Sequence, residues 1–469
     1  MKRKRPSKDE ADAAPRPLPS LVDHHKQLRA WLISEGATGL GTLKCHVSDK
    51  GGIGTFTTVR ILPGSVIAQI PQSCVLTATK ALRSEFGRTC KKALESYSEA
   101  TDEFVMMLWM SDGRRNPEHP FHHYLASLSE ISMATPITWP SALVEGPSKL
   151  GGTNVGKAIK DHKLLVGTTY LKLLNVIRSL HPHLFRSDFQ EEDMMWAHEC
   201  YLSRRFPSRL CPSEEEESSS SLPSSSSLSS SSSSSSLSNA GPNIGPPLAS
   251  TFSPLNEKLG VMLPFLDLTN HQQATKIHFH ATDSQVLFTC NDDAKGFFTD
   301  AEVFNNYGNK SNDGLLMAYG FCSFNNPFDS YGLKLMQRMS ATSEPIVVGM
   351  FWIFRSDNPG VEDGSVNQIP VALWRALADP ERYIESEKLK EHEEENETAL
   401  SIEYDDIEIL LQTLRAHLMP FTATQQADTA SASREMVLEN EYFVSCYRDG
   451  QRRVLEDVIA VLTSILASS

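Results

Sequence analysis

Apolar and polar positions divide the chain into β-rich and helical regions. Between residues 45 and 77, short apolar segments flank a Pro63-Gly64 turn, which predicts a β-hairpin. From about 78 to 200, apolar residues recur every three and four positions, for example in 103–110 and 168–180. This spacing is typical of helices that bury one face, so we expect a long helical insert after the hairpin.

Strand-like segments return after residue 260. Four of them have the apolar content of strands: VMLPFLDL (261–268), IHFH (277–280), QVLFTC (285–290) and AEVFNNYG (301–308). The last third again has apolar residues at helical spacing, in 407–418 and 435–466. The pattern predicts a β region, a helical insert, a second β region and a separate helical lobe.

Two polar tracts interrupt this pattern. Residues 1–22 are charged and rich in proline, and we expect them to be disordered. Residues 212–253 are dominated by serine, with four glutamates, and cannot bury enough apolar area to offset the entropy of the chain. Because strand-like segments lie on both sides of the serine tract, we expect a loop inserted inside one domain. A linker between two domains would separate segments of different character.

Charge and cysteine content narrow the functional classes. The net charge of −14 argues against direct binding to nucleic acid or to anionic membrane, and no apolar run approaches a membrane span. The eight cysteines form no CxxC pair, as expected of reduced intracellular thiols without a zinc framework. We expect a cytoplasmic or nuclear protein. The basic run Lys2–Arg5 fits either a nuclear import signal or a solvated tail.

Several motifs are compatible with a site but not specific. GGTNVGKA (151–158) matches most of a phosphate-binding loop, but it ends in alanine and follows a poor strand, so a glycine turn before a helix is preferred. GGIGTF (51–56) lacks the third glycine of a dinucleotide fingerprint. His278 and His280 alternate on one strand without a third ligand nearby, so we expect no metal site. Residues 303–321 fit either a functional turn or a strand and core helix without chemical role.

Taken in order, the motifs resemble a SET-domain protein methyltransferase of the Rubisco large-subunit methyltransferase type. The matching segments are GGIGTF (51–56), IPQSCVLT (70–77), the helical insert, SRRF (203–206), LPFLDLTNH (263–271), VFNNYGNKSN (303–312) and LLMAYGF (315–321). The final helix, with YRDGQRRVLEDV (447–458), resembles the substrate-binding lobe of that family. The resemblance implies an α+β SET fold with a pseudoknot at residues 23–335, containing the insert, and an all-α lobe at 336–469.

The resemblance also implies a site for S-adenosylmethionine and a channel for the acceptor. Its cofactor-binding residues would be Gly52, Ile53, Gly54, Arg204, Asn270, His271 and Tyr307, with Arg204 pairing with the cofactor carboxylate. Asp267 would support the segment before Asn270 from behind. Tyr307 is the catalytic candidate, because methyl transfer needs alignment and a desolvated channel more than acid–base help. Phe206, Tyr319 and Phe321 are the candidates for the channel wall.

The expected activity is methylation of lysine in a protein, with S-adenosylmethionine as cofactor. A ribosomal protein, an elongation factor, a histone or another protein could be the substrate. Two alternatives stay open: a histidine acceptor, which the apolar Phe206 disfavours, and a catalytically silent SET scaffold that binds a protein partner. Gly51 and Thr55 depart from the family, where a charged or larger residue is common, so the contacts of the first loop are open.

Overall fold

The computed structural model describes residues 19–50, 52–128, 135–211, 260–337, 344–358, 368–389, 404–422 and 434–468. The predicted serine-rich loop and most of the predicted N-terminal tail, including Lys2–Arg5, lie outside these ranges. The chain forms two compact units. The first comprises Met1–Met133, Leu165–Ser236 and Pro254–Gly308, and the second comprises Ala134–Leu164, Leu237–Ser253 and Asn309–Ser469. The predicted division at 335/336 stays a prediction, because compact units need not coincide with the domains of a family.

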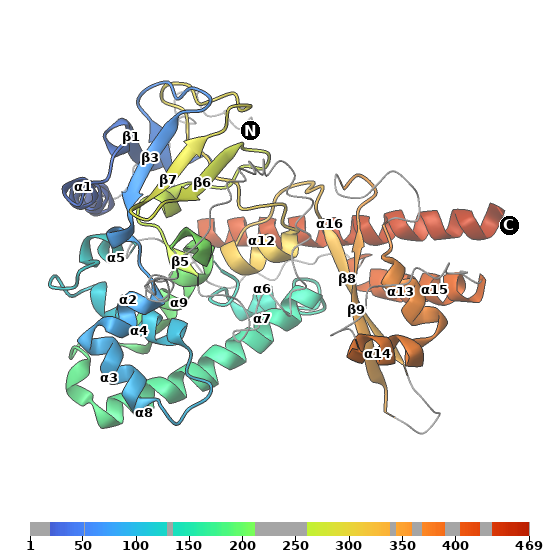
Figure 1. Cartoon of the computed structure of the whole chain (residues 1–469). Coiled ribbons are helices and arrows are strands. Elements are labelled where there is room, and N and C mark those ends of the chain that lie inside the picture. Colours follow the sequence, from blue (N-terminus) through green and yellow to red (C-terminus); the bar gives the residue numbers. More distant parts are fainter. Residues whose placement is uncertain are drawn as a thin grey trace, which may run out of the picture. The chain divides into compact units, whose positions relative to one another are not determined.

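The first unit contains small antiparallel sheets (Figure 1). β3 (Val66–Pro71), β7 (Gln285–Cys290) and β6 (Ile277–Ala281) form one sheet in the order β3-β7-β6. β1 (Leu43–Val47) pairs with β2 (Ile53–Thr57), and β4 (Arg205–Phe206) pairs with β5 (Val261–Met262). β6 and β7 therefore lie where the sequence predicted them.

The described part of this unit also contains helices. They are α1 (Pro19–Ser34), α2 (Ala78–Arg83), α3 (Glu85–Ala93), α4 (Asp102–Gly113), α5 (His122–Ser127), α8 (Leu171–Leu180) after a π-helical turn (Val166–Tyr170), and α9 (Glu191–Arg204). Short 3-10 turns occur at Leu40–Thr42, Gln72–Cys74, Pro182–Leu184, Ser208–Leu210 and Leu266–Leu268. Every residue from Phe104 to Met110 is buried, so α4 is the central helix of the predicted insert.

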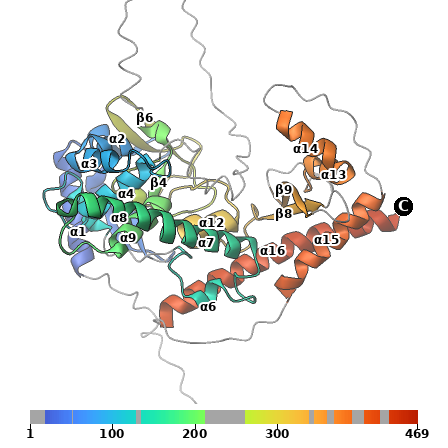
Figure 2. The same cartoon turned by 90° about the horizontal axis from the view of Figure 1, so that it is seen from below.

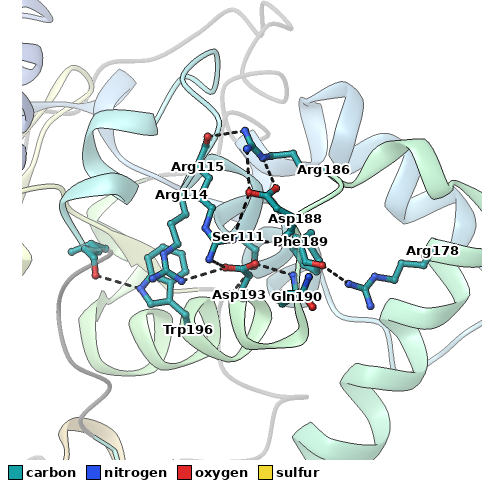
Figure 3. A network of polar contacts seen from close by, with 11 residues as sticks. Ser111, Arg114, Arg115, Arg178, Arg186, Asp188, Phe189, Gln190, Asp193 and Trp196 are labelled. Carbon is teal, nitrogen blue, oxygen red and sulfur yellow. Dashed lines mark hydrogen bonds and ion pairs between the residues drawn. The ribbon is translucent and has the colours of Figure 1, made fainter.

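An arginine network joins the helices of the insert (Figure 3). The buried Asp193 carboxylate pairs with Arg114 at 3.3 Å and with Arg115 at 3.0 Å. Its second oxygen accepts the backbone N–H of Gln190 at 2.9 Å, which caps the start of α9. The Arg114 guanidinium also lies 4.7 Å from the ring of Trp196. Both arginines contact groups of the protein itself. The network therefore serves to fix α4 against α9.

The second unit is mainly helical but also contains a hairpin. Its elements are α6 (Ser141–Val144), α7 (Asn154–Leu165), α12 (Asn312–Tyr319), β8 (Ser330–Gln337), β9 (Ile346–Phe354), α13 (Val371–Ala378), α14 (Pro380–Leu389), α15 (Tyr404–Thr422) and α16 (Arg434–Ser468). The helices predicted at 407–418 and 435–466 are confirmed as α15 and α16, which run along each other (Figure 2). The all-α lobe that was predicted for residues 336–469 also contains most of the hairpin β8–β9, which is a departure from the prediction. The inward face of the hairpin, including Leu333 and Phe351, packs into the helical core.

Three predicted β elements are wrong. Residues 263–268 form a turn and a 3-10 helix, with Phe265 at φ 72°, and only Val261–Met262 is a strand. A continuous run of apolar residues is compatible with a buried strand and with a buried turn or short helix, so the sequence pattern does not distinguish them. Residues 301–308 make isolated bridges at Glu302 and Asn305 without forming a strand. The predicted hairpin around Pro63-Gly64 does not form, because β3 pairs with β7 while Ile61 bridges to Phe297.

Candidate functional site

Tyr307 is held against the segment Thr269–His271 by three contacts. Its backbone N–H donates to Nδ1 of His271 at 3.0 Å, and its hydroxyl donates to the carbonyl oxygen of Thr269 at 2.9 Å. The rings of His271 and Tyr307 stack, with 5.1 Å between centroids and 27° between planes. Because Nδ1 accepts, the neutral His271 ring carries its proton on Nε2. The two predicted site residues thus lie together.

Asn305 joins the two backbones that carry these residues. Its N–H donates to the carbonyl oxygen of Asn270 at 2.8 Å, and its own carbonyl accepts the N–H of Gln272 at 2.9 Å. The result is a parallel bridge between His271 and Asn305. Asn305 is buried, so water does not compete for these bonds. The register of Tyr307 on His271 is therefore set by the main chain.

Asn270 connects this segment to the glycine-containing strand β2. Its side-chain Nδ2 donates to the carbonyl oxygen of Ile53 at 3.3 Å and to Oε1 of Glu302 at 2.8 Å. Gly54 lies against the same pair, and a Cβ at Gly54 would come within 2.1 Å of Oε1 of Glu302. Gly52 has a φ of +65°, which favours glycine. The structure thus places Ile53 and Gly54 against Asn270, and the predicted binding of a cofactor by Gly52, Ile53, Gly54 and Asn270 stays a prediction.

Arg204 forms its described contacts with Asp267. Nη1 of Arg204 donates to the carbonyl oxygen of Asp267 at 2.9 Å and lies 3.5 Å from its carboxylate. The Tyr124 hydroxyl donates to the same carboxylate at 2.8 Å. Burial raises the pKa of Asp267, while Arg204 and Tyr124 act in the opposite direction. Asp267 thus lies behind the Asn270 segment, and the predicted pairing of Arg204 with a cofactor stays a prediction.

The three residues predicted for the channel divide between the units. Phe206 belongs to the first unit, where its ring packs edge to face on Phe279 with 5.1 Å between centroids. Tyr319 ends α12 and Phe321 follows it, both in the second unit and half-buried, with ring centroids 6.2 Å apart. The channel itself stays a prediction.

Other motifs have structural explanations. Gly151 and Gly152 form a turn before α7, as expected of a glycine turn leading into a helix. His278 and His280 are exposed on β6, with 6.4 Å between ring centroids. Within the described ranges, no group of three or more histidine, cysteine or acidic residues is placed to hold a metal ion. The same ranges contain no helix with the length and apolar content needed to cross a bilayer.

Four residues of the site were missed by sequence reasoning. Glu302 and Ser48 hold the amide of Asn270 in place, Thr269 accepts the Tyr307 hydroxyl, and Tyr124 binds Asp267. Glu302 and Thr269 lie next to the motifs VFNNYG (303–308) and Asn270-His271, and this proximity is the sequence signal that could have pointed to them. Tyr124 lies 143 positions from Asp267 and carries no local signal.

No family model matches the chain. Over 84 residues it is 39% identical to ribosomal lysine N-methyltransferase set10 of Schizosaccharomyces pombe, covering 17% of this chain and 15% of that protein. Over 313 residues it is 24% identical to protein-lysine N-methyltransferase EFM1 of Saccharomyces cerevisiae, covering 65% of this chain and 51% of that protein. The chain therefore spans 15% and 51% of the length of these two curated relatives.

Solved structures match over nearly the whole chain. A crystal structure of the SET domain of LSMT bound to lysine and AdoHcy has a TM-score of 0.64 at 18% identity, covering 96% of this chain and 93% of that one. A structure of Rubisco LSMT bound to AdoMet has a TM-score of 0.61, also at 18% identity, with the same coverage of both chains. The chain therefore has the α+β SET fold of Rubisco LSMT with a largely helical C-terminal region, as the sequence predicted.

Proposed function

We propose that this protein is an S-adenosylmethionine-dependent protein-lysine N-methyltransferase. The observation that carries the proposal is the assembly of Tyr307, His271 and Asn270 beside the Gly52–Gly54 segment. This assembly occurs in a fold whose solved examples bind AdoHcy, AdoMet and lysine. The names of the curated relatives support lysine as the acceptor and a protein as the substrate.

The residues present fit the cofactor. Gly54 lets the Glu302 carboxylate and the Asn270 amide approach the main chain, since a Cβ at Gly54 would lie 2.1 Å from Oε1 of Glu302. Gly52 has a positive φ, which favours glycine, and a Cβ there would meet no atom within 4 Å, so its main chain is open to a ligand. Asn270 offers its side-chain oxygen as an acceptor, since its Nδ2 is already bonded to Ile53 and Glu302. Arg204 and the main chain of residues 52–54 would complete the binding set. When bound, S-adenosylmethionine supplies an electrophilic methyl group on a sulfonium.

The role that we assign to Tyr307 is orientation of the acceptor amine. Its hydroxyl proton is directed at the carbonyl oxygen of Thr269, so the phenolic oxygen keeps lone pairs for an incoming N–H. Main-chain bonding and stacking on His271 limit the freedom of the ring. A well-held acceptor of this kind contributes through alignment, and loss of alignment typically costs about a hundredfold in rate.

The amine must be neutral when it reacts. A free lysine has a pKa of about 10.4, so the site has to favour loss of the proton. An apolar wall lowers the pKa of an amine by desolvation, and Phe206, packed on Phe279, provides aromatic surface in the same unit. Phe206 has no hydrogen-bonding group for an imidazole, and no observation favours the histidine acceptor or the silent scaffold.

The substrate is a protein, and the first fractions to test are ribosomal. The short match at 39% identity is to a ribosomal lysine N-methyltransferase, as is a second one at 34% over 83 residues in Saccharomyces cerevisiae. A match over 313 residues is to a protein-lysine N-methyltransferase whose name specifies no ribosomal substrate. Ribosomal and non-ribosomal protein fractions should therefore be compared directly.

The test is transfer of radioactive methyl from S-adenosylmethionine to these fractions, followed by acid hydrolysis and amino-acid analysis. We expect methyl-lysine with the wild type, and about a hundredfold less with Tyr307→Phe at saturating cofactor. Tyr97→Phe is the matched control, because Tyr97 packs under Lys172 away from the site. Detection of methyl-histidine instead of methyl-lysine would show that the acceptor is histidine. If calorimetry detected no binding of S-adenosylmethionine, the proposed enzymatic activity would be refuted. The catalytically silent SET scaffold would then be the remaining hypothesis.

A further inference from the structure

Glu302 is a carboxylate whose two described hydrogen bonds both come from neutral groups. Its Oε1 accepts from Nδ2 of Asn270 at 2.8 Å, and its Oε2 accepts from the Ser48 hydroxyl at 2.7 Å. Within the described residues, no lysine or arginine forms an ion pair with it. The described role of the Glu302 side chain is therefore to accept hydrogen bonds from Asn270 and Ser48.

The two acceptors around Asn270 determine how its amide is turned. Nδ2 lies between the carbonyl oxygen of Ile53 and the carboxylate of Glu302, and neither group can donate. A flipped amide would place Oδ1 against two acceptors and lose both hydrogen bonds. The observed orientation is therefore enforced, and it leaves Oδ1 of Asn270 as the atom of the amide that can accept a further hydrogen bond.

Ser48 ties the same carboxylate to the turn between β1 and β2. Its hydroxyl oxygen accepts the N–H of Lys50 at 3.0 Å, and its N–H donates to the carbonyl of Gly52 at 3.0 Å. Ser48 is 5% exposed, so these bonds are sheltered from water. Glu302 therefore connects the glycine-containing turn with Asn270.

We propose that Glu302 is a positioning residue that fixes the Asn270 amide with Oδ1 directed at a donor group of the bound cofactor. The proposal rests on the proposed function, since it assumes that S-adenosylmethionine occupies this site. The donor is an N–H or O–H of the cofactor, because an outward carbonyl oxygen accepts and cannot donate. Glu302 acts through Asn270 and does not itself take part in methyl transfer.

The decisive measurement is calorimetric binding of S-adenosylmethionine to a double-mutant cycle of the full chain. We expect Glu302→Ala and Asn270→Ala each to weaken binding by about tenfold, and the double variant to bind no more weakly than Asn270→Ala alone. Additive losses, or unchanged binding by Glu302→Ala, would overturn the proposal. The thermal midpoint of each variant without cofactor shows whether it has folded.

Two further variants separate positioning from charge and from local structure. Glu302→Gln retains an oxygen for Asn270 and a polar group for Ser48, so we expect it to bind within about threefold of the wild type. A loss as large as that of Glu302→Ala would instead assign the effect to the negative charge and overturn the positioning role. Asp300→Ala removes a neighbouring exposed carboxylate that pairs with Lys44, and should leave binding unchanged. If the wild type itself does not bind, the proposed function fails, an outcome distinct from failure of the cycle.

Discussion

The backbone N–H of Tyr307 donates to Nδ1 of His271 at 3.0 Å while the two rings stack at 5.1 Å. A single imidazole thus supports both the main chain and the aromatic face of the candidate catalytic residue. The same bond fixes the tautomer of His271, because an accepting Nδ1 leaves the proton on Nε2. His271 is therefore a support for Tyr307 as well as a predicted cofactor contact.

Replacement of His271 should separate these two supports. His271→Ala removes the acceptor and the stacking partner, and we expect the rate of methyl transfer to fall by about tenfold to a hundredfold. His271→Asn places an amide oxygen near the former Nδ1, so it should recover part of the rate. Single-turnover rates at saturating cofactor check this expectation. Equal rates for wild type and His271→Ala would remove His271 from the support of Tyr307.

Gly54 offers a test of the packing around Asn270. An alanine Cβ would lie 2.1 Å from Oε1 of Glu302 and 3.0 Å from Nδ2 of Asn270, so the carboxylate must move and release the amide. We expect Gly54→Ala to weaken S-adenosylmethionine binding by about tenfold. Gly41→Ala is the matched control, since a Cβ at Gly41 would meet no atom within 4 Å and the φ of Gly41 is not positive. Calorimetry that gave the same affinity for both variants would show that the contact is unimportant.

Much of the fold follows from periodicity, and the exceptions share a physical cause. Helices α15 and α16 and strands β6 and β7 lie where apolar spacing predicted them. The segment 261–268 was misjudged because all its residues are buried, and burial on every side erases the period that distinguishes a strand from a turn. The hairpin β8–β9 was missed because its outward face also carries apolar residues, such as Val347 and Met350.

The site was predictable only where its residues adjoin a recognisable motif. Asn270, His271 and Tyr307 were found from short motifs, and a main-chain bridge brings them together. Glu302 was not, because a glutamate between apolar residues is typical of an exposed strand position. Its role depends on Gly54 and Ser48, which are about 250 positions away, and such a contact has no local signature.

Breaking the ion pair behind the site should cost stability. Asp267 has a side chain that is 0% exposed, and Arg204, at 16%, is its paired cation. Asp267→Asn keeps an oxygen for the Tyr124 hydroxyl but leaves the Arg204 charge uncompensated, which typically costs about 3 kcal/mol of unfolding free energy. Chemical denaturation compares it with Asp300→Asn, whose exposed pair with Lys44 should contribute at most about 1 kcal/mol. A loss no larger than that of the control would show that the charge is solvated.

Two buried carboxyls in the second unit predict a dependence of stability on pH. Asp313 accepts from the Tyr447 hydroxyl at 3.2 Å and from Gln451 at 3.1 Å, while Asp329 accepts from the backbone and side chain of Asn312 at 2.8 and 2.9 Å. Burial, followed by the charge of Asp329, raises the pKa of Asp313 to about 8. Burial likewise raises the pKa of Asp329 to about 7.

These pKa values determine the sign of the effect. In the unfolded chain both carboxyls lose their protons near pH 3.8, whereas the folded protein holds them until pH 7 to 8. The folded state therefore binds more protons between these limits, and its stability falls as pH rises through them. Each such proton contributes a slope of about 1.4 kcal/mol per pH unit. Above pH 8 the slope from these groups vanishes.

Asp313→Asn tests this dependence because it resembles the protonated carboxyl at every pH. We expect the variant to lose less unfolding free energy than the wild type between pH 5.5 and 8.5, with a slope reduced by about 1.4 kcal/mol per pH unit over most of this window. Hydrogen exchange in α12 and α16 localises the change, since Asp313 and Tyr447 belong to these helices. Asp405→Asn, at an exposed position of α15, is the matched control. Parallel pH profiles for wild type and Asp313→Asn would mean that Asp313 is ionised in the folded protein and that its hydrogen bonds outweigh its burial.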